Sequence, residues 1–507
     1  MWHRPAVVST RPTLLQTVET IADRPYRIAL LCLLISLATR FFAFDRSVID
    51  WDETTYLLGA RALLDGKVMY VDFWDFKPPG FFWLLTGLEA MFDDAILPLR
   101  VAAMLSVAAT GFVLSMISLA LAPRQKTAAL FAGLLYIVLI STNGLPNAIS
   151  ASGLDANTEH FFILFTCIGM YLVVRGAGRP SFALLAGLSI GTAFVIKYYV
   201  IADFLALLLA IWWMAGWRPW KPGWPARQAL TSFLLAGIGM VMPFLGVAGW
   251  YWMTGFWSEF AHAAFSAGPS YIVSQSIFDV MQYWGEFLYM GGLATVCFGA
   301  VAWRLLVGRT WRDFPFAPVL FIWLLAVLAV ITLTGRNRFH YLFQALPPLC
   351  LLGAQALNTD LFSSEVRYRR WLIGLTVALV LPIPIVDYLK YEHTFKRPDV
   401  PRMMAEYIER NASPDVPIYF YNCCHVGYYL TGRLPPTPYY QPSIVYQADY
   451  VSSAGFETRA ELERIRAQKP EFIVVRPGRG AEYVEMLTAG YRPDTTFADS
   501  IVVYRRE

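Results

Sequence analysis

The chain reads Ile49-Asp-Trp-Asp-Glu-Thr-Thr-Tyr56 directly after its first long apolar run, and Tyr70-Val-Asp-Phe-Trp-Asp-Phe-Lys-Pro-Pro-Gly80 follows shortly afterwards. Both pieces belong to an acidic segment at about 45–97. Asp52 and Glu53 suit the first turn of a helix, because the positive end of the helix dipole faces them. Lys77 precedes two prolines, which fix the backbone as it enters another helix. The segment therefore predicts charged groups at a membrane surface, with a short apolar helix at 79–92 lying in the interface.

Apolar runs of membrane-spanning length continue on both sides of this segment. Hydrophobic residues make up 57% of the 507 residues and charged residues only 15%, against roughly 25% charged residues in soluble proteins. A bilayer core needs about 20 apolar residues per helix. We expect an all-α polytopic membrane protein with about eleven spans, at 28–44, 98–122, 127–143, 160–175, 181–196, 199–215, 229–252, 285–307, 315–333, 341–358 and 371–388.

Basic residues mark every second short loop between these spans. They are Arg124, Lys126, Arg175, Arg179, Arg218, Lys221, Arg227, Arg304, Arg309, Arg312, Arg367, Arg369 and Arg370. Cytoplasmic loops carry an excess of Lys and Arg, so we expect these loops and the N-terminus in the cytoplasm. An odd number of spans then places the acidic segment and the C-terminus in the periplasm, as in a multi-pass protein of a bacterial inner membrane.

The composition changes from about residue 392 onwards. Ile418-Tyr-Phe-Tyr421, Phe472-Ile-Val-Val475 and Ile501-Val-Val-Tyr504 are typical of strands, and 402–410 and 457–468 are typical of amphipathic helices. We therefore expect a membrane domain at 1–391 and a small soluble α/β domain at 392–507. Cys423 and Cys424 are adjacent in this second domain, where they indicate two thiols or a redox-sensitive pair.

Further charged residues fall in the loops expected outside. Asp155 and Glu159 form a second acidic pair, four residues apart. The basic residues on this side, which oppose the orientation rule, are Lys197, Arg336, Arg338 and His340. An anionic headgroup such as a phosphate would explain them. The alternatives are simple pairing with the acidic loops and, for the acidic segment itself, a solvated surface.

The motifs of the acidic segment resemble those of the GT-C glycosyltransferase superfamily. Its pattern is Asp52-Glu53 followed by Tyr56, then Ala60-Arg-Ala-Leu-Leu-Asp-Gly66, then Lys77-Pro-Pro. The nearest relatives suggested are the bacterial lipid A aminoarabinose transferases and the protein O-mannosyltransferases. The piece Tyr341-Leu-Phe-Gln-Ala-Leu-Pro-Pro348 is similar to a late helix of the family. One residue departs from the pattern, since Thr55 stands where the aminoarabinose enzymes typically have arginine.

The resemblance implies a role for each candidate residue. Asp52, with Glu53 beside it, would be the catalytic carboxylate, and Asp155 and Glu159 the second acidic motif. The carrier phosphate would bind Lys77, with Arg336, Arg338 and Tyr56 as further ligands. Additional candidates are Lys197, His340 and Tyr341. No cofactor would be required, although a divalent metal at Asp52, Asp155 and His160 stays open.

The implied donor is a polyprenyl-phosphate-linked sugar in the bilayer, and the implied acceptor is lipid A or another envelope glycolipid. A protein acceptor is the first alternative. A transporter or flippase of lipid-linked sugars is the second, but transporters carry ionisable residues near the bilayer midplane, and the expected spans are almost free of charge. Net charge is only +4, and no RNA-binding motif is present, so no nucleic-acid partner is expected.

Overall fold

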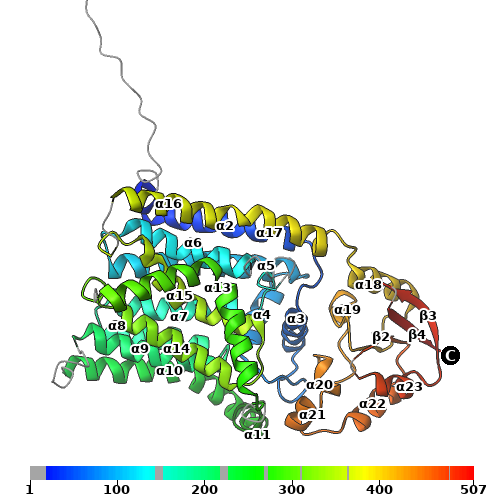
Figure 1. Cartoon of the computed structure of the whole chain (residues 1–507). Helices are drawn as coiled ribbons and strands as arrows, with labels where there is room; N and C mark the ends of the chain where they lie inside the picture. Colours follow the sequence, from blue (N-terminus) through cyan, green and yellow to red (C-terminus); the bar gives the residue numbers. More distant parts are fainter. Residues whose placement is uncertain are drawn as a thin grey trace, which may run out of the picture.

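The computed structural model describes residues 19–142, 152–216, 227–267, 272–308, 311–361, 365–478, 480–498 and 500–507, without the side chains of 365–369. A bundle of long helices occupies one side of the molecule, and a smaller part with short helices and a sheet occupies the other (Figure 1). The acidic segment lies between them.

The bundle consists of helices that each overlap an expected span. They are α2 Pro25–Arg40, α5 Ile96–Leu121, α6 Lys126–Thr142, α7 Thr158–Arg175, α8 Pro180–Phe194, α9 Ile201–Met214, α10 Arg227–Thr254, α13 Ile277–Gly308, α14 Ala317–Leu333, α15 Leu346–Gly353, α16 Glu365–Val380 and α17 Pro382–Lys390. Within the described residues, six helical segments are long and apolar enough to cross a membrane, and four more are apolar but shorter. The multi-pass architecture is confirmed, and the count of eleven crossings stays a prediction.

Small residues bring neighbouring helices close together in the bundle. A Cβ atom at Gly133 of α6 would lie 2.2 Å from the backbone oxygen of Gly111 in α5, and one at Gly187 of α8 would lie 2.2 Å from that of Ala236 in α10. Lipid tails are as apolar as the helix faces, so close van der Waals packing is what holds helices together in a membrane. Glycine at these crossings permits that packing.

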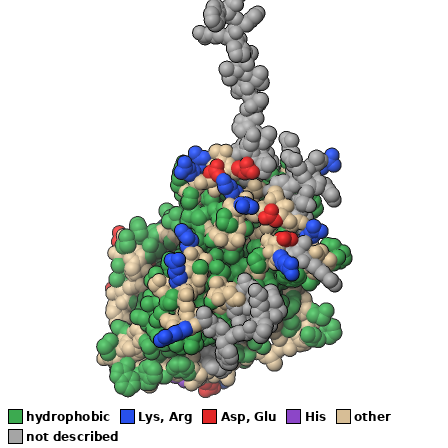
Figure 2. All heavy atoms as spheres, turned by 90° about the vertical axis from the view of Figure 1, so that its left-hand side faces the viewer, with side chains coloured by type: hydrophobic (Ala, Val, Ile, Leu, Met, Phe, Trp, Pro, Cys, Tyr) green, Lys and Arg blue, Asp and Glu red, His purple; other side chains and the backbone are tan. Residues whose placement is uncertain are grey.

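The two ends of the bundle differ in what they join. At one end, Lys126 forms an ion pair with Asp23, and Gln125 donates to Asp360 at 3.0 Å. Figure 2 looks onto this end, where Lys and Arg side chains are spread over the surface. Of the expected cytoplasmic basic residues, Arg218, Lys221 and Arg309, and the side chains of Arg367 and Arg369, lie outside the described residues. The opposite end carries the acidic segment and the sheet.

The acidic segment contains two helices, as expected. Helix α3 spans Trp51–Leu64, and the Asp50 carboxylate caps it by accepting from the Asp52 amide at 2.9 Å. Helix α4 spans Gly80–Glu89, shorter than the expected 79–92. Shorter helical turns at the same end are η1 Phe41–Ala43, η3 Tyr198–Val200, α11 Trp257–Ala261, η4 His262–Ala267 and η5 Phe339–Ala345. Of these turns, η3, η4 and η5 contribute residues to the cavity described below. The place of α3 and α4 at a membrane surface stays a prediction.

The C-terminal part contains a four-stranded sheet in the order β1-β2-β4-β3. Strands β1 Ile418–Tyr421, β2 Phe472–Val475 and β4 Ile501–Arg506 confirm the three predicted runs, whereas β3 Tyr491–Phe497 was not predicted. Strand β3 is a largely exposed edge strand containing Pro493, so it lacks an apolar pattern. The helices of this part are α18 Val400–Asn411, α19 Val426–Leu430, α20 Ser443–Tyr446, α21 Ala448–Ala454, α22 Thr458–Ala467 and α23 Val484–Thr488.

The C-terminal part is fastened to the acidic segment by polar contacts. The Trp74 amide donates to the Pro438 carbonyl at 2.9 Å. Arg61 of α3 donates to the Tyr429 carbonyl at 2.9 Å and forms an ion pair with Glu89 of α4 at 2.8 Å. These contacts hold α19 and the segment that follows it against α3 and the stretch before α4. The proposed domain boundary at 391/392 stays a prediction, because α17 continues through a π-helical turn, η7 Tyr391–Phe395, towards α18.

Candidate active site

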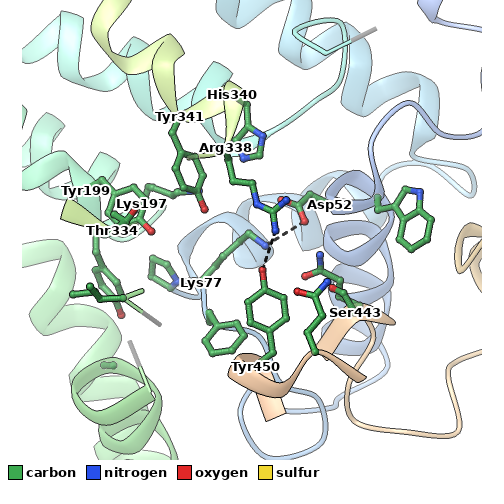
Figure 3. Close-up of a pocket in the computed structure, with 18 of the residues that line it drawn as sticks. Asp52, Lys77, Lys197, Tyr199, Thr334, Arg338, His340, Tyr341, Ser443 and Tyr450 are labelled. Atoms are coloured by element: carbon green, nitrogen blue, oxygen red, sulfur yellow. Dashed lines mark hydrogen bonds and ion pairs between the residues drawn. The ribbon is translucent and has the colours of Figure 1, made fainter. Parts of the chain in front are cut away.

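A cavity of about 920 Å³ opens where α3, the end of α8 and the C-terminal part meet. Figure 3 shows that it combines three kinds of surface. Its charged floor is lined by Asp50, Asp52, Lys77, Lys197, Arg338 and His340. Its apolar side is lined by Phe194, Phe244, Ala264, Phe265, Ile272, Val330 and Leu333. Its third side, here called the C-terminal wall, is formed by Asn422, Gln441, Ser443, Tyr446, Gln447 and Tyr450.

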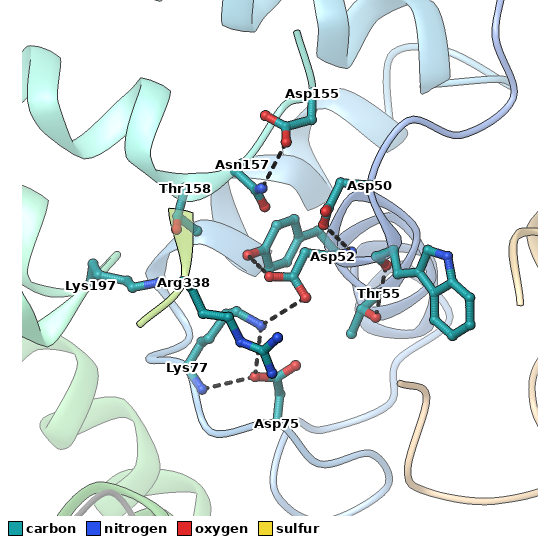
Figure 4. A network of polar contacts seen from close by, with 12 residues as sticks. Asp50, Asp52, Thr55, Asp75, Lys77, Asp155, Asn157, Thr158, Lys197 and Arg338 are labelled. Atoms are coloured by element: carbon teal, nitrogen blue, oxygen red, sulfur yellow. Dashed lines mark hydrogen bonds and ion pairs between the residues drawn. The ribbon is translucent and has the colours of Figure 1, made fainter. Parts of the chain in front are cut away.

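Lys77 lies at the centre of the charged floor. Its ammonium is 3.5 Å from Asp52 Oδ1 and 3.5 Å from Asp75 Oδ1, and 5.1 Å from the ring centroid of Tyr56. The Tyr56 hydroxyl lies 3.5 Å from Asp52 Oδ2, one helical turn away. Figure 4 shows these side chains converging from α3 and from the segment before α4. The structure thus brings Asp52, Lys77 and Tyr56 together.

The backbone around Lys77 is held by its own sequence. Asp75 accepts from the Lys77 amide at 2.9 Å, and the Tyr70 hydroxyl donates to the Lys77 carbonyl at 2.6 Å. The Gly80 amide donates to the Val195 carbonyl at 2.9 Å. A Cβ atom on Gly80 would lie 2.4 Å from that same oxygen, so only glycine permits this approach. The Lys-Pro-Pro-Gly run therefore places Lys77 beside the end of α8.

The neighbouring charges set different protonation states for the two aspartates. Burial raises the pKa of Asp52, but Lys77, His340 and Lys197 outweigh it, so the pKa of Asp52 lies below its usual range. Burial, together with the charge on Asp52, raises the pKa of Asp50 to about 7. Asp52 is therefore ionised at neutral pH, whereas Asp50 is partly protonated.

Lys197 belongs to the same floor. It follows α8 and forms an ion pair with Glu159 of α7 at 3.1 Å. Its ammonium lies 4.5 Å from the ring centroid of Tyr341 and 5.5 Å from that of Tyr199. Pairing of the outer basic residues with the acidic loops therefore does occur, yet Lys197 still lines the cavity. Glu159 does not line the cavity and holds Lys197 from behind.

The two candidate arginines point in different directions. Arg338 lines the cavity and donates to the Tyr450 hydroxyl at 3.3 Å. Arg336 forms an ion pair with Asp449 of α21 and stacks against the Tyr450 ring, 4.8 Å from its centroid. Arg336 therefore clamps α21 to the loop after α14. His340 lines the cavity beside Tyr341, and burial lowers the pKa of His340.

Glu53 lies one residue from Asp52 but turns away from the cavity. Its carboxylate forms an ion pair with Arg100 of α5 at 3.1 Å and accepts from the amides of Ile49 and Ala156 at 3.0 and 2.7 Å. Glu53 thus ties the start of α3 to α5 and to the second acidic loop. This geometry fits a positioning residue better than the catalytic role predicted for it.

The second acidic motif lies behind the floor. Asp155 accepts from the Asn157 side-chain amide at 3.1 Å, and burial, with Asp50 and Glu53 nearby, raises the pKa of Asp155 well above its usual range. The His160 ring nitrogens face the backbone carbonyls of Gly153 and Asn157 at 3.0 and 3.3 Å. Both ring nitrogens of His160 are used in these local contacts, so His160 does not fit as a ligand of a metal shared with Asp52. Nowhere in the described residues do three or more His, Cys, Asp or Glu side chains gather as metal ligands.

Thr55, at the position that departs from the family pattern, is buried beneath the C-terminal part. His425 Nε2 donates to the Trp51 carbonyl at 3.0 Å and lies 3.2 Å from Thr55 Oγ1. His425 is itself buried, with 1% of its surface exposed. Nearby, Cys423 and Cys424 are both free thiols, the first buried and the second partly exposed.

Sequence reasoning missed several cavity residues. The N-cap pattern before α3 could have identified Asp50. Tyr199 lies two residues after the candidate Lys197 and could have been named with it. The C-terminal wall gave no signal, because asparagine, glutamine, serine and tyrosine in a loop-rich stretch are common in any soluble domain.

With this geometry in view, comparisons with known proteins place the molecule in a class. The family model described as "Dolichyl-phosphate-mannose-protein mannosyltransferase" matches residues 76–245. The resemblance stated from the sequence is confirmed: the chain has the fold of the GT-C glycosyltransferases.

The curated relatives lie in the aminoarabinose branch. The chain is 25% identical over 361 residues to the undecaprenyl phosphate-alpha-4-amino-4-deoxy-L-arabinose arabinosyl transferase of Pseudomonas aeruginosa PAO1. It is 24% identical over 361 residues to the enzyme of the same name from Pseudomonas paraeruginosa. These matches cover 67% of this chain and 61% of each relative.

Two solved structures share the overall fold. ArnT from Cupriavidus metallidurans, bound to undecaprenyl phosphate, has a TM-score of 0.63 and 16% identity, with 97% of this chain and 98% of that chain covered. The oligosaccharyltransferase of Archaeoglobus fulgidus has a TM-score of 0.52 and 13% identity, with 92% and 70% covered. At these identities the likeness extends to the fold.

Proposed function

We propose that the chain is an inverting glycosyltransferase that takes a sugar from a polyprenyl-phosphate carrier. The observation that carries this proposal is the position of Lys77 and Arg338 in one cavity with both Asp52 and an apolar side. A phosphate beside these two cations would leave its polyprenyl tail against the apolar side and its sugar near Asp52. The solved ArnT structure with undecaprenyl phosphate supports the choice of ligand.

The leaving phosphate sets the electrostatic task of the site. When the bond between the anomeric carbon and the phosphate oxygen breaks, negative charge builds up on the phosphate. Lys77 and Arg338 stabilise that charge from fixed positions, which is most effective where water is excluded. Lys77 exchanges its contacts with Asp52 and Asp75 for the phosphate, so donor binding also frees the Asp52 carboxylate to act.

Asp52 then serves as the general base. It accepts the proton of an acceptor hydroxyl as that oxygen forms a bond to the anomeric carbon from the side opposite the phosphate. One such displacement inverts the anomeric configuration. The released carrier phosphate keeps the bonding electrons, and the proton on Asp52 passes to it or to solvent.

The reaction is proposed for the periplasmic face of the inner membrane. The Lys and Arg side chains that Figure 2 shows lie at the end of the bundle opposite the acidic segment (Figure 1). Loops rich in Lys and Arg favour the cytoplasm. The proposed acceptor is lipid A or another envelope glycolipid, as in the aminoarabinose branch. A protein acceptor is the second candidate, favoured by the family match to protein mannosyltransferases.

Mass spectrometry of envelope glycolipids tests this function. Cells lacking the gene should lose a fixed sugar mass from one glycolipid, wild-type protein should restore it, and the Asp52→Asn protein should not. Unchanged lipids with altered secreted glycoproteins would select the protein acceptor. If both were unchanged while the carrier-linked sugar still crossed the membrane in a gene-dependent way, the chain would be a transporter.

A further inference from the structure

The C-terminal wall differs in chemistry from the rest of the cavity. Its side chains are three amides, one serine hydroxyl and two phenols, and none is charged: Asn422, Gln441, Ser443, Tyr446, Gln447 and Tyr450. Among the described cavity residues, every charged side chain comes from residues 50–340. In Figure 3, Ser443 and Tyr450 lie across the cavity from His340 and Tyr341. The cavity therefore has a charged face and an uncharged polar face.

Ser443 supplies an unused polar group on this wall. The residue is only 8% exposed, and its hydroxyl finds no hydrogen-bond partner among the described residues. A buried hydroxyl without a partner is rare in a folded protein and calls for a ligand or a water. Gln441 and Gln447, on either side of α20, are partly exposed and add two amides to the same face.

Other residues hold the wall in a fixed shape. The Tyr446 hydroxyl donates to Asn422 Oδ1 at 2.5 Å, and the Tyr446 ring packs edge-on against Tyr421 at 5.8 Å. Asn422 adopts a left-handed backbone conformation with φ of 56° directly after β1. Arg336 clamps α21 through Asp449. A preorganised set of hydrogen-bonding groups reduces the entropy lost when a ligand binds.

Amides and hydroxyls both donate and accept hydrogen bonds, as sugar hydroxyls do. A phosphate or carboxylate would instead call for lysine or arginine. Resting on the proposed function, we infer that the C-terminal wall binds an uncharged, polyhydroxylated sugar next to Asp52. That sugar belongs either to the donor or to a glycan of the acceptor, and its hydroxyls satisfy Ser443, Gln441 and Gln447.

The test compares the wild-type protein with a variant carrying Ser443→Ala, Gln441→Ala and Gln447→Ala, both full length in detergent. The bare carrier undecaprenyl phosphate and its neutral glucosyl and mannosyl forms are the first probes. Uncharged oligosaccharides, added to protein saturated with undecaprenyl phosphate, are the second. Ser452→Ala serves as the matched control, because Ser452 is exposed on α21 and does not line the cavity.

If the wall holds the donor sugar, the wild type binds a glycosylated carrier more tightly than the bare one. The affinity of the triple variant for the glycosylated carrier is then about tenfold lower than that of the wild type. If it holds an acceptor glycan, the variant instead loses oligosaccharide binding. In both cases the affinity for bare undecaprenyl phosphate stays unchanged, and Ser452→Ala behaves as wild type.

Two results would overturn the inference. In the first, the triple variant keeps wild-type affinity for every sugar-bearing probe. In the second, it loses affinity for bare undecaprenyl phosphate to the same degree, which would make the wall part of a phosphate site. A wild type that fails to bind bare undecaprenyl phosphate would count against the proposed function instead, while sugar binding lost in the variant would still support the wall.

Discussion

As the proposed general base, Asp52 must meet two requirements at once: it must stay ionised and must stay near the reacting carbon. Lys77, His340 and Lys197 keep its pKa low, and its side chain is 14% exposed, open to the cavity. A general base contributes roughly a hundred- to ten-thousandfold in rate. We therefore expect Asp52→Asn to lower sugar transfer by at least about a hundredfold, measured with purified protein and glycosylated carrier.

The matched control for this change is Asp65→Asn, at the exposed C-terminal end of the same helix. It should transfer as the wild type does. Asp65→Asn should unfold at the wild-type temperature, because Asp65 is exposed. Asp52→Asn should stay folded but unfold at a lower temperature, because it loses the charge interactions that lower the pKa of Asp52. Near-normal turnover by Asp52→Asn would remove this residue from the mechanism.

Lys77 is the cation that an incoming phosphate meets beside Asp52. Charge-assisted hydrogen bonds contribute about 1.5–3 kcal/mol. Lys77→Ala should therefore weaken undecaprenyl phosphate binding by roughly ten- to a hundredfold, measured by titration in detergent. Lys67→Ala, an exposed lysine of the same segment, is the control and should bind normally. Unchanged affinity in Lys77→Ala would assign phosphate binding to Arg338 and Lys197 instead.

The sequence predicted the floor of the site better than its other sides, because several residues of the floor lie close together in the chain. Asp52, Tyr56 and Lys77 belong to short motifs whose spacing is visible in the chain. By contrast, the different partners of Arg336 and Arg338 are Asp449 and Tyr450, which lie more than a hundred residues away. Likewise, the local sequence does not distinguish the role of Glu53 from that of Asp52, because the ion pair between Glu53 and Arg100 of α5 is formed only in the folded chain.

At the scale of elements, the start of α4 depends on one glycine. A Cβ atom on Gly80 would meet the Val195 carbonyl, whereas Gly87 in the same helix has no neighbour within 4 Å of such an atom. Gly80→Ala should lower the free energy of unfolding by about 1–3 kcal/mol and weaken carrier binding, because Lys77 moves with the helix. Thermal unfolding and carrier titration measure the two effects.

Gly87→Ala is the internal control and should have the opposite sign. Alanine loses less backbone entropy than glycine in a helix, so a gain of about 0.5–1 kcal/mol is expected. Equal effects of the two substitutions would show that the contact with Val195 does not determine how α4 begins.

The contact between α3 and α19 is sensitive to pH through His425. Its ring faces the Trp51 carbonyl, Thr55 Oγ1 and, further away, Asp52. Burial lowers the pKa of His425 from 6.5 to about 4, although the Trp51 carbonyl and Asp52 oppose the shift. Between these values the unfolded chain binds more protons than the folded one, so stability falls as pH decreases from 6.5 towards 4.

Relative to His425→Gln, which lacks this contribution, the wild type should therefore lose more of its thermal midpoint between pH 7 and pH 5. Asp50 and Asp155, whose raised pKa values act in the opposite direction, are present in both proteins. His393→Gln, an exposed histidine, should keep the wild-type dependence. An identical drop in His425→Gln would assign the acid sensitivity to another group.

The sequence also predicted most elements, because their patterns are strong and local. Every expected span overlaps a helix, and three strands of the sheet match their apolar runs. Strand β3 escaped because an exposed edge strand with Pro493 needs no apolar face. Helices α20 and α21 escaped because four and seven residues carry too little periodicity.

At the scale of the whole molecule, orientation follows from the basic end of the bundle. In a protein lacking Cys424, the exposed substitution Asp65→Cys should react with a membrane-impermeant maleimide added from the periplasm. Arg124→Cys, exposed at the basic end, should react only after the inner membrane is opened. The reverse pattern would invert the proposed topology and place the cavity in the cytoplasm.

The cavity joins residues from the first tenth of the chain to residues beyond 420. Because synthesis proceeds from the N-terminus, the whole bundle is made before the C-terminal wall, which then covers Asp52. Until then, the ionised carboxylate and its cations face open water, which can itself act as the attacking nucleophile. Under the proposed function, a chain that ends before α20 should therefore hydrolyse its donor, and the wall is what favours transfer to an acceptor over hydrolysis.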